Sequence, residues 1–145
     1  MDVSLPNYEK PIHSNKEMQP MYAFAANTNQ GINRNYNEDR VSIVLNADCP
    51  QNQDKSLWPK VHFFGVYDGH GGHGWAEYLR NSLHKFVISD PIFLANPKQA
   101  LVNGFKKAEK VFIDEIQLNS NIKKFEVTDP SGSWANVALI IDDSK

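Results

Sequence analysis

The sequence predicts an α+β domain, because strand-like and helix-like patterns both occur in it. Three apolar runs, residues 39–46, 61–67 and 134–141, have the length and composition of strands. Between the second and third runs, apolar residues recur at spacings of three and four, which is typical of helices packed against a core. The 145 residues are 41% hydrophobic and 22% charged, the composition of an ordinary folded domain.

The predicted strands place acidic residues from different parts of the sequence close together. A first strand, residues 22–27, leads into a loop, and residues 48–59, with two prolines, are typical of the connection between the strands 39–46 and 61–67. In such an antiparallel hairpin, Glu38 and Asp39 begin one strand and Asp68 follows the other. We therefore expect the three carboxylates at the same end of the hairpin.

The helical region has two parts. Trp75, Leu79, Leu83 and Phe86 describe one face of a helix that ends near Ser89. A second helix begins at Asn96, Pro97 and Gln99, a cap, a first-turn proline and an amide three residues after the cap, and its apolar face includes Leu101, Phe105, Ala108, Phe112 and Ile116. Residues 1–20 hold three prolines without periodicity and predict a flexible arm, which leaves residues 21–145 as the domain.

A polar cluster follows the strand 61–67. Asp68 offers the carboxylate that Mg²⁺ and Mn²⁺ prefer, Gly69 could offer its carbonyl, and His70 offers an imidazole, the side chain best suited to proton transfer. The alternative is a simple Asp-Gly turn after a strand. By itself this stretch does not distinguish the two.

A second cluster lies upstream. Arg34, whose guanidinium matches phosphate oxygens, precedes the adjacent carboxylates Glu38 and Asp39 by four residues. Phosphate binding and metal binding are both implied, and a solvated charge cluster is the alternative. A zinc site built from His62, His70 and His73 is less favoured, because His62 lies inside the predicted strand and no Cys or Glu-x-x-His pattern completes a zinc ligand set.

Together and in this order, these stretches resemble the metal-dependent serine/threonine phosphatases of the PPM type, which are like protein phosphatase 2C. That family has an Arg, three residues, a Glu-Asp pair and then an apolar strand ending in Val-x-Asp-Gly-His-x-Gly, which matches Arg34, Glu38-Asp39 and residues 66–72. A third match is Ser131-Gly132-Ser133, followed by an apolar strand. Trp134 departs from the small residue usual in the family at that position.

The resemblance implies a β-sandwich of two antiparallel sheets flanked by helices, of which this chain carries about the N-terminal half. It also implies two Mg²⁺ or Mn²⁺ ions held by Asp68, the Gly69 carbonyl, Glu38 and Asp39. A hydroxide on these ions would attack phosphoserine or phosphothreonine in proteins, without a phosphoenzyme. Arg34 would bind the phosphate and His70 would protonate the leaving oxygen.

The later family motifs, Gly-Asp-Ser-Arg, Asp-Gly and Asp-Asn, do not occur in these 145 residues. We therefore expect the strand 134–141 to expose an edge, and self-association is one way to complete the site. The alternative function is a catalytically incomplete member of the family that binds phosphoproteins or regulates them.

The net charge and the cysteine content limit the kinds of binding partner and the cellular compartment that we expect for this protein. A formal net charge of −2 and scattered lysine pairs give no support to a nucleic-acid or membrane partner. Cys49 is the single cysteine, so no intramolecular disulfide can form, and the first 20 residues lack a signal-peptide pattern. We expect a protein of the cytoplasm or nucleus that acts on phosphorylated proteins.

Overall fold

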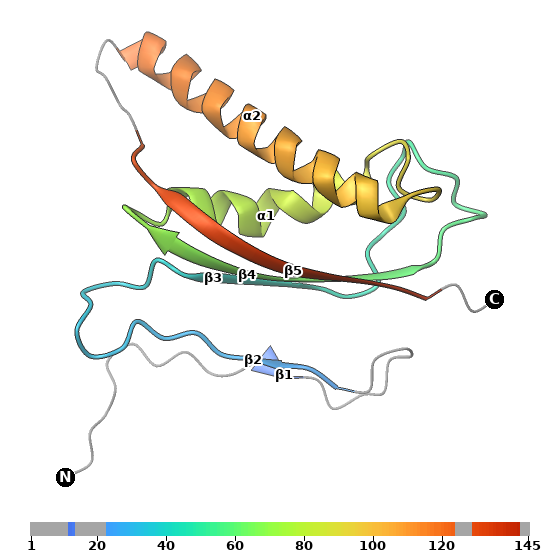
Figure 1. Ribbon diagram of the computed structural model, residues 1–145, viewed down its shortest axis with the longest axis horizontal. Helices are drawn as coiled ribbons and strands as arrows, with labels where there is room; N and C mark the ends of the chain where they lie inside the picture. Colours follow the sequence, from blue (N-terminus) through green and yellow to red (C-terminus); the bar gives the residue numbers. More distant parts are fainter. Residues whose placement is uncertain (1–11, 14–22, 124–128, 143–145) are drawn as a thin grey trace.

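The computed structural model describes residues 12–13, 23–123 and 129–142, with the side chains of 23–116 and 129–142 (Figure 1). These residues form a three-stranded antiparallel sheet in the order β3-β4-β5, a separate two-stranded ladder and two helices. The elements are β1 (Ile12–His13), β2 (Ala25–Ala26), β3 (Arg40–Val44), β4 (Lys60–His70), α1 (Gly74–Ile88), α2 (Pro97–Lys123) and β5 (Gly132–Asp142).

The register of the sheet confirms the predicted hairpin. β3 and β4 pair with Arg40 opposite Tyr67, and β5 runs antiparallel along all of β4 with Asp68 opposite Trp134. Because side chains alternate between the faces of a strand, Phe63 and Tyr67 point to one face while Asp68 and its even-numbered neighbours point to the other. The buried Tyr67 hydroxyl lies 3.0 Å from Ser42 Oγ, and burial raises the pKa of Tyr67.

The core lies between the sheet and the helices. Figure 1 shows α1 against one face of the sheet and α2 beyond it. Phe63, Tyr67, Leu79, Leu83 and Val87 are almost completely buried there, in a cluster that includes Ala108 of α2. The predicted aromatic and aliphatic helix faces are therefore core.

The second helix begins as the sequence predicts. Asn96 Oδ1 accepts a hydrogen bond of 3.0 Å from the backbone N–H of Gln99, which satisfies one of the free donors of the first turn. The Gln99 side chain does not close a capping box, since its amide donates to Asn103 Oδ1. Within the described part of the chain, no helix is long and apolar enough to cross a membrane.

The opposite face of the sheet is only partly covered. The segment that carries β2 runs across it, and the rings of Phe24 and Phe64 lie 6.1 Å apart (Figure 1). Val66 stays 55% exposed on this face. The α+β class is thus confirmed, with one sheet of the predicted sandwich and helices on one side.

The predicted flexible arm, residues 1–20, falls mostly outside the described residues. The exception is β1, whose Ile12 and His13 pair with Ala26 and Ala25 of β2. The boundary at residue 20 stays a prediction.

Two imidazoles of the fold predict a loss of stability in acid. Burial lowers the pKa of His62, which is fully buried in β4, and of His84 on α1, so the folded state binds fewer protons than the unfolded state. The free energy of unfolding should therefore fall as pH drops below about 6.5, the unfolded pKa, and the loss should end once the pH is below the folded pKa values.

Urea unfolding between pH 7.5 and 5.0 measures this loss. His84 Nδ1 is buried and has no hydrogen-bond partner among the described residues, and the His84 ring lies 6.1 Å from that of Phe63. His84→Phe therefore removes a titrating group without breaking a hydrogen bond of Nδ1. This variant should lose less stability over the same range, and an unchanged slope would contradict the assignment.

Candidate active site at the end of the central strand

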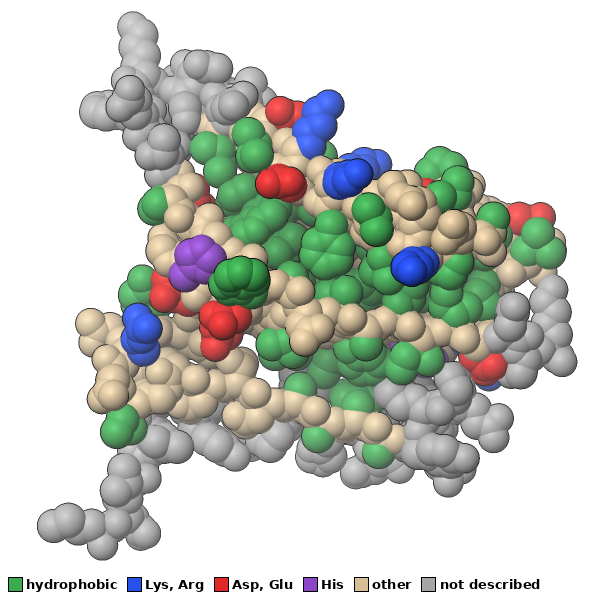
Figure 2. Space-filling model, viewed as in Figure 1, with side chains coloured by type: hydrophobic (Ala, Val, Ile, Leu, Met, Phe, Trp, Pro, Cys, Tyr) green, Lys and Arg blue, Asp and Glu red, His purple; other side chains and the backbone are tan. Residues whose placement is uncertain are grey.

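Four segments meet at one end of the sheet: the end of β4, the start of β5, the start of α1 and the loop before β3 (Figure 1). Acidic, histidine, hydrophobic and basic side chains gather at this end, on the left of the space-filling view (Figure 2). The segments of the three predicted motifs are therefore brought to one end of the sheet, although Glu38 and Ser131 lie 93 positions apart in the chain.

Backbone donors from the end of β4 hold the carboxylate pair before β3. The N–H of Gly72 donates to Glu38 Oε1 at 2.6 Å, and the N–H of Gly69 donates to Asp39 Oδ1 at 3.3 Å. A Cβ on Gly69 would overlap the carbonyl oxygen of Glu38, so only glycine allows this approach. The predicted proximity of Glu38 and Asp39 to the Asp68-Gly69 stretch is observed.

Arg40 also fixes the acidic loop, and sequence reasoning missed it. Its Nη1 donates to the carbonyl oxygens of Asn37 and Asp39, each at 2.8 Å, while Nε donates to Glu77 on α1. This pairing lowers the pKa of Glu77. Arg40 thereby links the acidic loop to α1. The only sequence feature that could have indicated this role is the position of a basic residue directly after the Glu-Asp pair.

The glycine turn between β4 and α1 is anchored by the segment that leads into β5. Gly71 and Gly72 have φ values of 68° and 128°, which non-glycine residues rarely adopt. Ser131 Oγ accepts a hydrogen bond of 2.8 Å from Trp75 N–H in the first turn of α1, whose cap residue supplies no side-chain bond. Asp129 in turn accepts a hydrogen bond from Ser131 N–H at 2.9 Å.

His70 lies at the last position of β4, opposite Gly132 of β5. A Cβ on Gly132 would overlap His70 Nε2, so the imidazole packs directly against the Gly132 backbone. The glycine of the Ser131-Gly132-Ser133 motif therefore makes room for the histidine. His70 remains exposed, as proton transfer to a bound molecule requires.

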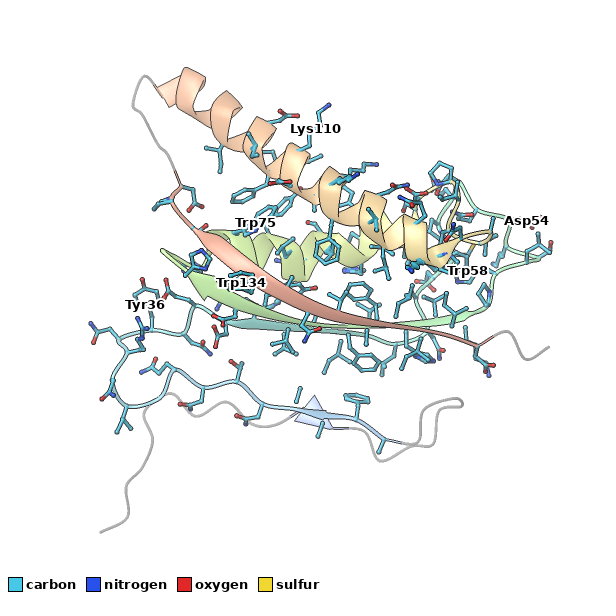
Figure 3. All side chains as sticks on the ribbon, viewed as in Figure 1. Tyr36, Asp54, Trp58, Trp75, Lys110 and Trp134 are labelled. Carbon is cyan, nitrogen blue, oxygen red and sulfur yellow. The ribbon has the colours of Figure 1, made fainter. Side chains whose placement is uncertain are left out.

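The remaining predicted residues are solvent-facing. Arg34 is exposed in the loop before β3 and makes no ion pair with another described residue. Asp68 is exposed on the sheet face away from the helices, and across the strand from it stands Trp134, which is 76% exposed. Figure 3 shows Trp134 at this end of the sheet.

The donor chemistry fits a hard cation better than zinc, but the ligand set is incomplete. Three carboxylates and a backbone carbonyl are the oxygen donors that Mg²⁺ and Mn²⁺ take. Among the described residues, no three His, Cys, Asp or Glu side chains converge closely enough to hold a metal ion. The zinc alternative finds no support, since His62 lies inside β4 and its Nδ1 accepts a hydrogen bond from Asn46 N–H.

Comparison with known proteins tests the family resemblance independently of the geometry. The family model described as Protein phosphatase 2C matches residues 26–144. Probable protein phosphatase 2C 11 of Arabidopsis thaliana is 40% identical over 84 residues, which are 57% of this chain and 20% of that protein. Protein phosphatase 2C homolog 3 of Schizosaccharomyces pombe is 34% identical over 103 residues, 70% of this chain and 22% of that protein. The chain thus spans about a fifth of the length of these relatives.

Proposed function

Since the chain belongs to the protein phosphatase 2C family, a family of protein serine/threonine phosphatases, we propose that it takes part in the metal-dependent removal of phosphate from phosphoserine and phosphothreonine in proteins. One observation carries the proposal. The Glu38-Asp39 pair is hydrogen-bonded to the glycines that follow Asp68, so the acidic residues of two distant motifs share one end of the sheet.

The metal proposal assigns two Mg²⁺ or Mn²⁺ ions to Asp68, the Gly69 carbonyl, Glu38 and Asp39. Bound ions of this kind lower the pKa of a water molecule and neutralise charge on a phosphoryl group. The hydrogen bonds to Glu38 Oε1 and Asp39 Oδ1 hold each carboxylate in place and leave its second oxygen for a ligand.

Arg34 and His70 supply the rest of the chemistry. The Arg34 guanidinium, which has no competing ion pair in the described part of the chain, would bind two oxygens of the phosphate. The His70 imidazole would donate a proton to the departing seryl or threonyl oxygen, a leaving group that is poor when unprotonated. A groove of about 1000 Å³, lined in part by Tyr36, Asp39 and Glu77, opens beside the acidic loop and is large enough for part of a peptide.

The proposal also covers partners and compartment. Phosphorylated proteins are the expected partners, and the single unpaired Cys49 favours a reducing compartment, the cytoplasm or nucleus. β5 has no strand on its outer edge among the described residues, and from Gly132 to Ile141 it carries no charge that would oppose strand pairing. Self-association through this edge is testable by sedimentation at increasing protein concentration.

A noncatalytic role is the second candidate, and one observation favours it. The described carboxylates do not form a group that could hold a metal ion, so a phosphoprotein-binding function could remain without turnover. Such a protein would use Arg34 to bind phosphate and would not depend on Mn²⁺.

The decisive assay follows phosphate release from a phosphothreonine peptide by the 145-residue chain, with Mn²⁺ and with EDTA. We expect turnover with Mn²⁺ only, and His70→Gln should lower kcat by about 10²- to 10⁴-fold because the leaving oxygen loses its proton donor. His73→Gln is the matched control, because His73 makes no side-chain bond at the start of α1. Peptide binding without turnover would instead support the noncatalytic role.

A further inference from the structure

The start of α1 is hydrogen-bonded to segments on both of its sides. The N–H of Trp75 donates to Ser131 Oγ at 2.8 Å, in the segment that leads into β5. Glu77, in the same first turn, accepts a hydrogen bond from Nε of Arg40, the first residue of β3. The glycine turn that ends β4 leads directly into α1. The start of α1 therefore joins the acidic loop before β3, the end of β4 and the segment before β5 (Figure 1).

Arg40 ties the backbone of the acidic loop to this helix. Only 19% of its side chain is exposed, and Nη1 donates to the carbonyl oxygens of Asn37 and Asp39 at 2.8 Å each. One guanidinium can serve a carboxylate and two carbonyls because its five N–H donors are held in a rigid plane. The peptide groups just before Glu38 and just after Asp39 are thereby fixed relative to Glu77.

We propose that the ion pair of Arg40 with Glu77 positions the Glu38-Asp39 pair for metal binding. This inference rests on the proposed function. Arg40 is a positioning residue, because its bonds to the acidic loop are to backbone carbonyls and not to the carboxylates that would bind the ions. Charge alone predicts the opposite effect, since a guanidinium near carboxylates repels Mn²⁺ and its removal would strengthen Mn²⁺ binding. The sign of the change in affinity therefore separates positioning from electrostatic repulsion.

Titration of variants with Mn²⁺ in a calorimeter tests the proposal. Arg40→Gln should raise the Kd for Mn²⁺ about 10- to 100-fold, the usual cost of losing a residue that orients metal ligands. Arg40→Lys keeps the charge but cannot serve three acceptors with one rigid group, so its Kd should rise as well. Adding Glu77→Gln to Arg40→Gln should change the Kd by no more than about twofold, because the two side chains act as one unit.

Amide hydrogen exchange gives a second readout, which needs no metal. The N–H groups of Gly69 and Gly72 donate to Asp39 and Glu38, so their exchange rates report whether these carboxylates are held in place. In Arg40→Gln, both amides should exchange about 3- to 10-fold faster. The amides that pair β4 with β5 should keep their rates, which shows that the sheet is folded. If Arg40→Gln does not fold, the milder Arg40→Lys decides the question by the same two measurements.

Arg80→Gln is the matched control. Arg80 is exposed, lies 3.7 Å from the same Glu77 carboxylate and makes no hydrogen bond to the acidic loop among the described residues. Its loss should leave the Kd for Mn²⁺ within about twofold. Equal or tighter Mn²⁺ binding by the folded Arg40 variants would overturn the positioning role and leave the phosphatase proposal intact. If the unmodified chain does not bind Mn²⁺, the metal proposal fails and this inference fails with it.

Discussion

Replacing Asp68 with asparagine is expected to lower Mn²⁺-dependent phosphate release by at least about 10³-fold. The substitution preserves shape but removes the charge that would hold the ions, and a metal ion contributes several kcal/mol to phosphoryl transfer, with each 1.36 kcal/mol worth a factor of ten. Because Asp68 is exposed and its carboxylate accepts no hydrogen bond from another described residue, the variant should fold normally. The measurement is kcat/KM with a phosphothreonine peptide.

The matched control is Asp114→Asn, which removes the same charge from an exposed position on α2. It should keep kcat/KM within about twofold of the unmodified chain, since an exposed surface charge that binds no ion has only a small screened effect. Equal losses of kcat/KM in Asp68→Asn and Asp114→Asn would show that the activity depends on net charge and not on a carboxylate at the end of β4.

Replacing Phe63 with alanine is expected to lower the free energy of unfolding by about 3–5 kcal/mol, the cost of removing a buried aromatic ring from a packed core. Phe63 is completely buried between the sheet and α1. Urea unfolding at pH 7.5 measures the change.

The adjacent Phe64→Ala is the control for that experiment. Phe64 points to the opposite face, which is only partly covered, so it fills less of the core and its loss should cost less. A cost for Phe64→Ala equal to or above that for Phe63→Ala would contradict the assignment of the core to the helical face.

The sequence predicted most of the fold because its patterns are local. The apolar run at residues 61–67, the repeat of Leu79 and Leu83, and the cap at Asn96 each depend on near neighbours in the chain. It also predicted that Glu38 and Asp39 would lie beside the end of β4, because a hairpin places those ends together.

The contacts that hold the site could not be predicted, because they join residues far apart in the chain. The bond from Trp75 to Ser131 spans 56 residues, and the pairing of Arg40 with Glu77 spans 37. The strand at residues 134–141 was predicted, but the 76% exposure of Trp134 depends on what else covers that sheet face. The roles of Arg34, His70 and Asp68 stay predictions.

Titration of the chain with Mn²⁺ in a calorimeter tests the central claim most directly. The account predicts saturable binding that EDTA reverses and that Asp68→Asn abolishes, whereas Asp114→Asn leaves it unchanged. Binding of equal strength in the unmodified chain and in Asp68→Asn, or no binding at millimolar Mn²⁺, would contradict a metal site at the end of β4.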